Sequence, residues 1–336
     1  MVATMKDIAR SLGVSVVTVS KVLRNHSDIS AETRKRVLLR MKELNYQPNP
    51  AARALVTGRT NLIGLIVPDL LHPFFAQVAK GISGQLRTQE YSMIIASSED
   101  DPNLEQREID QMLARRVDAL ILASTQSSSE SLRRVEERKI PCVLLDRRIP
   151  GVSASFVGND DVMAGSLATT HLIEAGCRTI AHLGGSDVST ATDRQAGYSM
   201  ALVKGGLSLP TEYIVRYGSG DDSGDAAGYK GMKRLLALNP KPDGVFCCND
   251  PIAMGAMRAI LEAGLRIPED VAIVGCGNLH FDDLLRIPLS SVDQDSAGLG
   301  ANAAKLALSF IKRKSNTPLK SLLLPVNLVV RASSKR

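Results

Sequence analysis

The feature that most constrains the fold of this chain is an alternation of short apolar runs and longer helical stretches after residue 61. The apolar runs are rich in β-forming residues, and most of the stretches between them are long enough for crossover helices. This alternation predicts parallel sheets that are covered by helices on both faces. The expected strands are 62–68, 92–97, 118–124, 141–146, 179–184, 244–249, 271–275 and 290–294, and the expected helices include 73–89, 104–115, 162–175 and 251–263.

The number of predicted strands indicates that this region has two lobes. A single sheet of roughly eight to ten strands would be unusually large. The chain has 336 residues, which is enough for two or three domains at about 100–200 residues each. In folds of this kind a ligand binds at the carboxyl ends of the strands, in the cleft between the halves. We therefore expect an α/β core with a ligand cleft.

The charge of the chain is concentrated near its N-terminus. Residues 1–60 contain eleven lysine or arginine residues and four acidic residues. The remaining 276 residues contain 30 basic and 31 acidic groups. A small basic module joined to a nearly neutral one indicates a part that binds a polyanion, attached to a part with another function. A solvated basic helical surface is the alternative interpretation, and charge alone does not separate the two.

The basic module contains start signals for three short helices. Thr4 and Asp7 have the spacing of a capping box, and Ser15 stands where it would cap a second helix over 16–23. Ser30 begins a third helix that extends to about Leu44. The residues of this third helix that we expect to face inward are Val37, Leu38, Met41 and Leu44.

The spacing of three small residues favours a helix-turn-helix over a generic three-helix bundle. Ala9 allows two helices to cross closely, Gly13 turns the chain, and Val19 fills the shared core. Together with the basic charge, this pattern predicts DNA binding.

At this point the sequence resembles a known family. The segments 4–23 (TMKDIARSLGVSVVTVSKVL), 30–36 (SAETRKR) and 44–49 (LNYQPN) are similar to the headpiece of the lactose-repressor (LacI/GalR) family of bacterial transcription regulators, and 51–55 (AARAL) is similar to its hinge helix. The resemblance implies an all-α headpiece and hinge helix followed by a two-lobed core.

The second helix of a helix-turn-helix lies in the major groove, with its N-terminal residues at the base edges. Its outward positions here are Val16, Val17 and Lys21. The valines offer apolar contact to thymine methyl groups, and Lys21 offers donors to guanine without the planar fork of an arginine. The alternative for the two valines is that they complete the headpiece core.

Polar residues around this helix are expected to contact phosphates or to cap helices, which orients the protein without specifying a sequence. The complete set of residues predicted to bind DNA is Thr4, Ser15, Val16, Val17, Thr18, Ser20, Lys21, Asn25, Arg34, Ala52 and Leu55.

The segment that follows the headpiece is predicted to be a conditional connector. The prolines at 48 and 50 keep the start of the linker out of a helix. A helix over 51–56 is too short to persist alone in water. The resemblance implies that Leu55 is a wedge at a minor-groove base step and that Ala52 forms the contact between two paired hinge helices. A disordered tether is the alternative in the absence of DNA.

The resemblance continues through the segments 63–68, 72–75, 143–147, 179–185, 194–198, 248–256, 267–275 and 324–333. It implies a core similar to the periplasmic sugar-binding proteins. Arg194 would supply a donor fork, and Phe74 would stack on a sugar face. Core packing is the alternative for one of the phenylalanines, and helix capping is the alternative for Asp250. The residues that the resemblance places in the cleft are Phe74, Phe75, Asp146, Arg194, Asn249 and Asp250, with Asp160 and Asp161 as weaker candidates.

One position departs from the family pattern. The family commonly has Gly-Tyr/Phe-Asp-Asp after the strand at 271–274, whereas this chain has Gly275, Cys276, Gly277 and Asn278. The aspartate that often holds a sugar hydroxyl is therefore replaced by Gly277. Asn278 and His280 are the candidates to take its place, and Asn278 completes the predicted effector-binding set.

The predicted organisation has three parts: a DNA-binding headpiece (1–46), a linker and hinge helix (47–60), and an effector-binding and dimerisation core (61–336). The first lobe of the core is expected at about 61–160 and 291–320, and the second at about 161–290 and 321–336. The function predicted is a transcriptional regulator and repressor. We expect a homodimer on a pseudo-palindromic operator, controlled by a small molecule such as a sugar.

Other classes of function lack their motifs. The five cysteines are scattered without a CxxC pair, so neither a disulfide framework nor a metal site is expected, and no cofactor is expected. The absence of GxSxG, HExxH and Walker A sequences argues against an enzyme. No apolar run reaches the ~18–20 residues of a membrane span, and no signal peptide is evident, so a cytoplasmic protein is expected. The alternative function is a solute-binding protein without DNA binding, which would need export.

Overall fold

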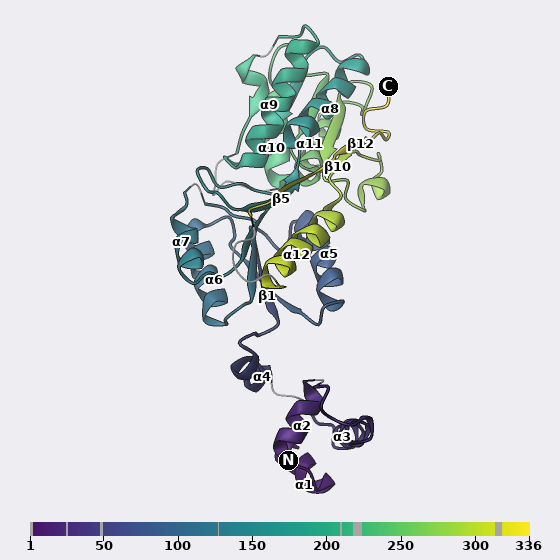
Figure 1. Ribbon diagram of the computed structural model, residues 1–336. Helices are drawn as coiled ribbons and strands as arrows, with labels where there is room; N and C mark the ends of the chain where they lie inside the picture. The colour runs from purple at the N-terminus through teal and green to yellow at the C-terminus, as the bar shows by residue number, and fades with distance from the viewer. Residues whose placement is uncertain are drawn as a thin grey trace. The chain divides into compact units, whose positions relative to one another are not determined.

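The computed structural model describes residues 3–24, 26–47, 50–126, 128–208, 210–217, 224–312 and 318–336. The chain divides into two compact units, Met1–Thr60 and Asn61–Arg336. The elements of each unit are labelled in Figure 1. Within the described residues no helix is long and apolar enough to cross a membrane.

The first unit is helical. Its helices are α1 (Met5–Leu12), α2 (Val16–Leu23), α3 (Ala31–Glu43) and α4 (Pro50–Thr57). The first three helices enclose a small core, in which the buried side chains are Ile8, Ala9, Val19, Val22 and Val37.

The predicted helix caps are confirmed. Thr4 Oγ1 accepts a hydrogen bond from the backbone N–H of Asp7, and the Asp7 carboxylate accepts one from the N–H of Thr4, which completes the capping box. Gly13 ends α1 with a φ of 65°, a left-handed conformation that glycine adopts without steric penalty. Ser15 Oγ accepts from Thr18 N at 3.0 Å and starts α2. The turn therefore has the helix-turn-helix geometry that the sequence predicts.

The prediction that Leu38 faces inward is wrong, because 50% of its surface is exposed. Val37, Met41 and Leu44 pack in the core as predicted. These three positions follow the helical repeat, whereas Leu38 lies about 100° further around the helix than Val37.

The second unit contains two six-stranded sheets, as the alternation of strands and helices predicts. The order of strands is β11-β5-β4-β3-β1-β2 in the first sheet and β12-β10-β9-β8-β6-β7 in the second. Among the described strands, every neighbouring pair is parallel except β10 with β12. The bounds of the first sheet are β1 (Leu62–Val67), β2 (Ser92–Ser97), β3 (Ala119–Leu122), β4 (Cys142–Leu145), β5 (Ser155–Asn159) and β11 (Ser321–Leu324), and those of the second are β6 (Ile180–Leu183), β7 (Ile214–Val215), β8 (Gly244–Cys247), β9 (Ala272–Cys276), β10 (Ser290–Asp293) and β12 (Asn327–Val329).

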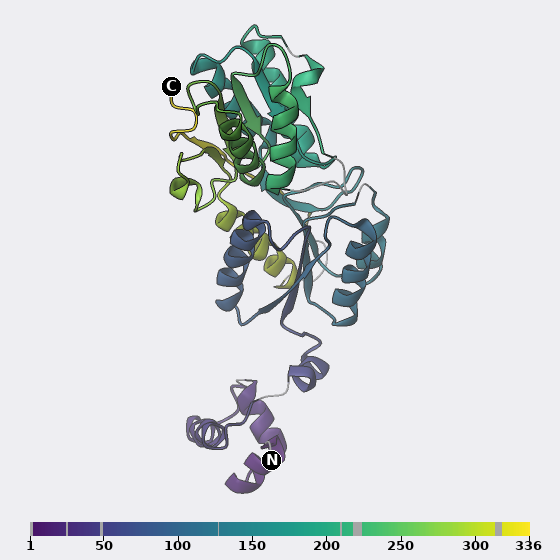
Figure 2. The same ribbon diagram turned by 180° about the vertical axis from the view of Figure 1, so that it is seen from behind.

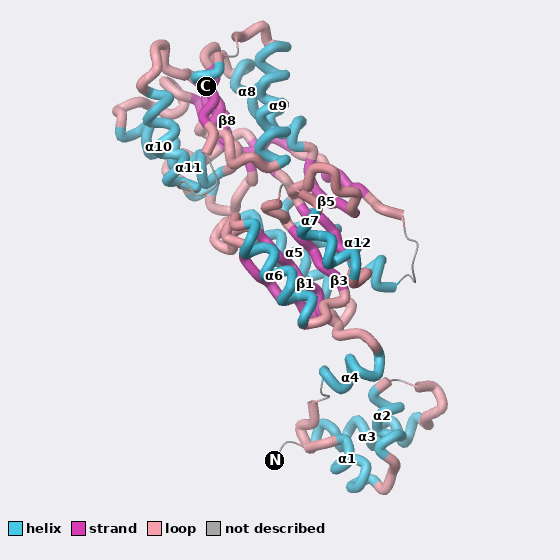
Figure 3. The backbone as a smooth tube through the Cα atoms, turned by 90° about the vertical axis from the view of Figure 1, so that its left-hand side faces the viewer, coloured by secondary structure: helices cyan, strands magenta, loops and turns pink. Residues whose placement is uncertain are grey.

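Helices cover both faces of each sheet, so that each lobe has three layers (Figures 1 and 2). Figure 3 shows the strands of these layers between their helices. The first sheet lies between α5 (Pro73–Arg87) with α12 (Ser296–Lys312) and α6 (Pro102–Ala114) with α7 (Glu130–Glu137); the second lies between α8 (Asp161–Glu174) with α9 (Ser189–Lys204) and α10 (Gly224–Leu236) with α11 (Asp250–Glu262). Short 3-10 helices are η1 (Thr211–Tyr213) and η2 (Asp282–Leu284).

The chain crosses between the lobes three times, and the last two crossings correct the predicted lobe boundaries. Segment 290–293 is β10 of the second sheet, although residues from 291 onward were expected in the first lobe. Segment 321–324 is β11 of the first sheet, although residues from 321 onward were expected in the second lobe. Alternating hydrophobicity identifies a strand but does not say which sheet it joins, so these assignments need the pairing itself.

Glycine pairs bring helices into backbone contact in both lobes. A Cβ atom at Gly81 of α5 would lie 2.0 Å from the Ala297 carbonyl oxygen of α12, and one at Gly300 of α12 would lie 2.1 Å from Val78 O of α5. The same reciprocal arrangement joins α8 to α9 through Gly165 and Gly197. It also joins α10 to α11, where the glycines are Gly228 and Gly255. These crossings therefore have no room for any larger residue.

Replacement of Gly81 by alanine should lower the free energy of unfolding by about 1–3 kcal/mol, the usual cost of overpacking, because the new methyl group meets a backbone oxygen. Gly84 of the same helix is the matched control, since a Cβ there would have nothing within 4 Å. The Gly84→Ala variant should be as stable as the wild type or up to about 1 kcal/mol more stable, as alanine favours helix. Urea denaturation measures both variants, and equal stability of the two would contradict the backbone contact.

Candidate DNA-binding surface and effector cleft

The N-terminal half of α2 presents apolar side chains to solvent. Val17 is 61% exposed and Val16 is 38% exposed, whereas Val19 and Val22 of the same helix are buried. Val17 therefore does not complete the headpiece core, which excludes that alternative for this residue. The outward face of α2 is therefore available for a partner.

The hydroxyl groups around α2 are engaged in caps. Ser15 Oγ lies 2.9 Å from Thr18 Oγ1, in addition to accepting from Thr18 N. Thr4 Oγ1 donates to the Asp7 carboxylate at 2.6 Å while it caps α1. These contacts fix the N-terminal ends of both helices, so the N–H groups and hydroxyls there are held in place before any partner binds.

Lys21 on the outward side of α2 forms an ion pair that the sequence analysis missed. Its Nζ donates to Oδ2 of Asp28 at 2.5 Å, and 36% of the lysine side chain and 52% of the aspartate side chain are exposed. The hydrogen bond from Lys21 lowers the pKa of Asp28. A spacing of seven residues across a loop carries no recognisable sequence signal, which is why the pair was not foreseen.

Arg34 connects the start of α3 to the loop before it, since its Nη2 donates to the backbone oxygen of His26 at 2.6 Å. Ser20 lies on α2 and is half-buried. Asn25, which belongs to the predicted DNA-binding set, lies outside the described residues.

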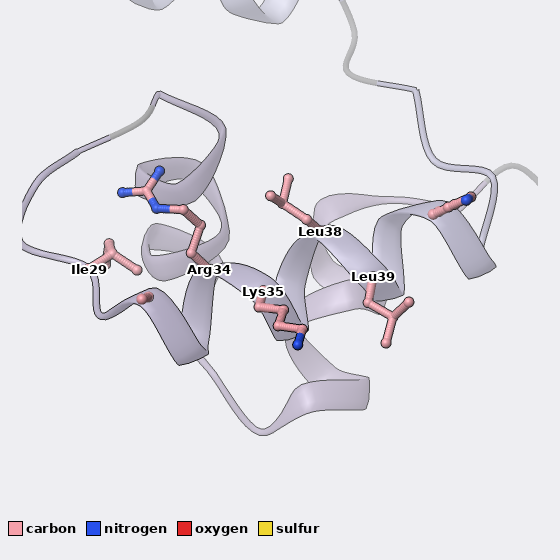
Figure 4. A pocket seen from close by; sticks show the side chains of 7 residues that line it. Ile29, Arg34, Lys35, Leu38 and Leu39 are labelled. Carbon is pink, nitrogen blue, oxygen red and sulfur yellow. The ribbon is translucent and has the colours of Figure 1, made fainter.

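The outer face of α3 forms an open groove of about 600 Å³. Apolar and cationic side chains line it together (Figure 4). Leu38, the residue expected in the core, lies in this groove beside the exposed Leu39. The lining residues are Ile29, Ala31, Arg34, Lys35, Leu38, Leu39 and Lys42.

The helix α4 is confirmed at nearly the predicted bounds and presents Leu55 to solvent. Leu55 is 81% exposed, the largest exposed fraction of any large apolar residue in the described part of the first unit. Gly58 ends the helix with a φ of 70° and donates from its N–H to Ala54 O. The side chain of Ala52 lies outside the described residues.

In the core, the predicted cleft residues of the first lobe lie at the ends of β1 and β4. Phe74 and Phe75 follow β1, pack edge to face with ring centroids 5.1 Å apart, and are both buried in the core of the first lobe. Asp146 follows β4 directly, is buried, and has a left-handed φ of 63°. Burial raises the pKa of Asp146, and the charges of Arg194 and Arg147 oppose that rise.

His72 lies beside Phe74 and Phe75 and was not among the predicted cleft residues. Its ring contacts Phe74 and Phe75 edge to face, and its Nδ1 is buried without a partner among the described residues. Burial lowers the pKa of His72 to about 4, and Arg147 and Arg194 add to this effect. The signal that could have found it is its position directly before the Pro-Phe-Phe helix start.

Arg194 of the second lobe is held by two hydrogen bonds. Its Nε donates to Asp161 Oδ1 at 2.7 Å, and its Nη1 donates to the carbonyl oxygen of Cys248 at 2.6 Å. Burial raises the pKa of Asp161 to about 7, and the Arg194 guanidinium opposes the rise. The charge of Arg194 acts to lower the pKa of both Asp146 and His72 of the first lobe, so these groups lie within electrostatic range of one another.

The predicted capping role of Asp250 is wrong, because Asn249 is the N-cap of α11: its Oδ1 accepts from Ile252 N at 2.9 Å. Asp250 is completely buried, and its two oxygens accept from Ser291 Oγ at 2.6 Å and from Leu279 N at 3.2 Å. Both carboxylate oxygens of Asp250 thus have hydrogen-bond partners within the second lobe.

Asp250 lies beside the position that departs from the family pattern. A Cβ atom at Gly277 would lie 2.8 Å from Asp250 Oδ2, and one at Gly275 would lie 2.2 Å from Oδ1. The carboxylate thus fills the space that a side chain at 277 would need. The neighbouring Asn278 is also engaged, as its Oδ1 accepts from Arg331 Nη2 at 2.7 Å.

Comparison with known proteins shows to which family this chain belongs. Residues 4–49 match the sequence profile described as "Bacterial regulatory proteins, lacI family", and residues 60–332 match that of "Periplasmic binding proteins and sugar binding domain of LacI family". The chain is thus a DNA-binding transcriptional regulator with a small-molecule-binding core of the periplasmic-binding-protein type. It belongs to the lacI family of bacterial regulatory proteins.

Two relatives illustrate this membership. The chain is 32% identical over 336 residues to the HTH-type transcriptional repressor PurR of Pasteurella multocida, with 99% of each chain covered. It is 35% identical over 332 residues to the ribose operon repressor of Haemophilus influenzae, with 98% of each covered.

Solved structures agree with the family. The Lac repressor dimer bound to operator and the anti-inducer ONPF has a TM-score of 0.86 and 28% identity, with 99% of each chain covered. The complex of the transcriptional regulator CelR with cellobiose has a TM-score of 0.75 and 28% identity, covering 98% of this chain and 99% of the other.

The buried pair Asp250 and Asp282 makes a testable contribution to pH dependence. Burial, and then the charge of Asp250, raises the pKa of Asp282 to about 8. An unfolded aspartate titrates near ~4, so folding takes up a proton between about pH 4 and pH 8, and this group destabilises the fold as the pH rises through that range. Relative to the Asp282→Asn variant, the wild type should lose stability between pH 5 and pH 8 in denaturant titrations. The exposed neighbour Asp283 provides the control variant Asp283→Asn, which should leave the dependence of stability on pH unchanged. An equal dependence for the wild type and Asp282→Asn would exclude the proton uptake.

Proposed function

We propose that this chain is a homodimeric transcriptional repressor whose first unit binds a pseudo-palindromic operator and whose core binds a small-molecule effector. The observation that carries the proposal is the exposure of Val17 beside Lys21 on the helix after the turn, in a segment with eleven basic residues. Apolar contacts and donors on such a helix are what major-groove recognition requires. The solved structure of the Lac repressor dimer bound to operator, a protein of similar fold and 28% identity, supports the same mode of binding.

Within this proposal the side chains divide into two groups. Val16 and Val17 contact thymine methyl groups, and Lys21 donates to a guanine. The residues that orient the headpiece on phosphates and sugars are Thr4, Ser15, Thr18, Ser20, Asn25 and Arg34.

The helix α4 serves as the hinge between the two units. Because it has only eight residues, it is too short to be stable alone and depends on DNA and on its symmetry mate. The exposed Leu55 enters a minor-groove step, where an apolar wedge unstacks and kinks the duplex. Ala52 forms the close contact between the two hinge helices.

The effector binds at the carboxyl ends of the strands, near Arg194 and Asp146. The ligand is a small polar molecule such as a sugar or sugar derivative, in keeping with the names of a ribose operon repressor and a cellobiose complex among the relatives. Phe74 and Phe75 form the apolar base of the site, and Asn249 and Asn278 support its second-lobe wall. Ligand binding changes the relation of the lobes and thereby the spacing of the hinges, which couples the two sites.

We assign no catalytic activity to the chain and place its action on DNA in the bacterial cytoplasm. A solute-binding protein without DNA function would have no use for the capped helix-turn-helix, so that alternative is not favoured.

The proposed DNA contacts predict different effects for two kinds of cation. Lys21→Ala should relax the preference at one base pair of each half-site, whereas Arg10→Ala should weaken binding to all sequences alike, since a phosphate contact carries no sequence information. Selection of duplexes from a random pool, followed by affinity measurements against a salt series, tests both. Identical behaviour of the two variants would exclude the groove assignment, and affinity independent of salt would exclude the phosphate contacts.

The proposed cleft predicts that Arg194 carries ligand recognition. Sugars, sugar acids and purines are screened by thermal shift on the full chain, and a ligand that raises the melting temperature is then tested on Arg194→Lys. The variant should lose most of the ligand-induced shift, because lysine lacks the planar donor fork. Arg258→Lys, on the exposed ion pair with Glu262, is the control and should keep the shift. A full shift in Arg194→Lys would contradict the assignment.

A further inference from the structure

An acidic residue beside the recognition helix needs a physical reason, because it opposes binding to a polyanion. The described part of the first unit has four acidic side chains. Asp7 caps α1, Glu32 lies in the first turn of α3, and Glu43 pairs with Arg40 near the end of α3. Each of these three has a role in helix stability. Asp28 has none of these roles, and its contact is with Lys21.

Lys21 belongs to the same outward face as Val17, since the two residues are four positions apart on α2. The Lys21 ammonium therefore stands at the edge of the surface that presents Val17, which is 61% exposed. Asp28 Oδ2 lies 2.5 Å from that ammonium group. The carboxylate is thus placed at the recognition surface itself.

A lysine on its own is a poor reader of base sequence. Its ammonium is a point charge on a flexible stem, and it has no planar fork to fix its direction. On DNA such a group is drawn to the nearest phosphate, and a phosphate contact adds affinity without specificity. A carboxylate beside the ammonium changes both its direction and its attraction to phosphate. It holds one of the three N–H donors, and it repels phosphate oxygens.

We propose that Asp28 is a specificity-determining positioning residue, which holds the Lys21 ammonium at a base edge and excludes it from phosphate contact. The inference rests on the proposed DNA-binding function. The base pair read in this way is G·C, because guanine offers two acceptors to the remaining donors of the ammonium. Asp28 lowers affinity for DNA in general and raises the preference for the operator, an arrangement in which repulsion provides the selectivity.

The chain offers a closely matched control. The Arg40–Glu43 ion pair also joins a cation to a carboxylate, at 2.8 Å, and 35% and 49% of its side chains are exposed. The corresponding fractions for Lys21 and Asp28 are 36% and 52%. Asp28→Asn and Glu43→Gln therefore remove the same charge from pairs of equal exposure, and they differ in whether the pair lies on the recognition helix.

The experiment measures the affinity of the full-length protein for its selected operator, for every single-base variant of one half-site, and for a non-operator duplex, all at one salt concentration. Asp28→Asn should tighten binding to the non-operator duplex more than to the operator. It should also lose about tenfold of preference at a single G·C base pair, the one at which Lys21→Ala loses preference. The double variant with both Lys21→Ala and Asp28→Asn should lose no more preference at that base pair than the single variants do. Glu43→Gln should change all affinities by one common factor.

Two further results test the interpretation. Asp28→Glu, which restores a carboxylate, should recover the preference at that base pair, and the melting temperature of Asp28→Asn should match that of the wild type because an exposed pair adds little stability. If the base-by-base profiles of Asp28→Asn and Glu43→Gln coincide, the role of Asp28 is excluded. If the wild type itself prefers no duplex over another, the proposed DNA-binding function fails instead.

Discussion

The ion pair between Arg194 and Asp161 is the interaction on which the arrangement of the second lobe at its strand ends depends. It joins α9 to α8, and the second hydrogen bond of the guanidinium, to Cys248 O, fixes both helices to the end of β8. Both side chains are buried, so removal of one would leave an uncompensated charge in a medium of low polarity. Asp146 lies in the electrostatic field of the same guanidinium from the other lobe. The pair thus sets the position of the second lobe's main donor group and connects it to the first lobe.

The two functional surfaces solve opposite physical problems. The recognition helix keeps Val17 in water, at a cost in hydrophobic free energy, so that an apolar contact remains for a base edge. The site at the strand ends does the reverse: it buries charged groups such as Arg194 and Asp146, and Arg194 is held there by hydrogen bonds to Asp161 and Cys248. Binding at the recognition helix therefore gains free energy from desolvating apolar groups. Binding at the site around Arg194 replaces, or adds to, hydrogen bonds that already exist.

Local chemistry was predictable from the sequence, and long-range placement was not. The caps at Thr4 and Ser15 and the turn at Gly13 follow from residue types within four positions of each other, and the structure confirms them. The strands β5, β7, β11 and β12 were not predicted; β7 and β12 have only two and three residues, too few for a recognisable strand pattern. The pairing of Lys21 with Asp28 and the filling of the space above Gly277 by Asp250 depend on contacts across loops and between strands. No spacing rule describes such contacts.

The glycine-lined helix crossings limit how the core can respond to a ligand. At Gly165 and Gly197 the backbones of α8 and α9 already touch, and Arg194 belongs to that contact, since its carbonyl oxygen meets Gly165. Helices interlocked in this way cannot slide over each other without steric overlap. A ligand that rearranges the core would therefore have to act through the three connections between the sheets, where the chain passes from one lobe to the other.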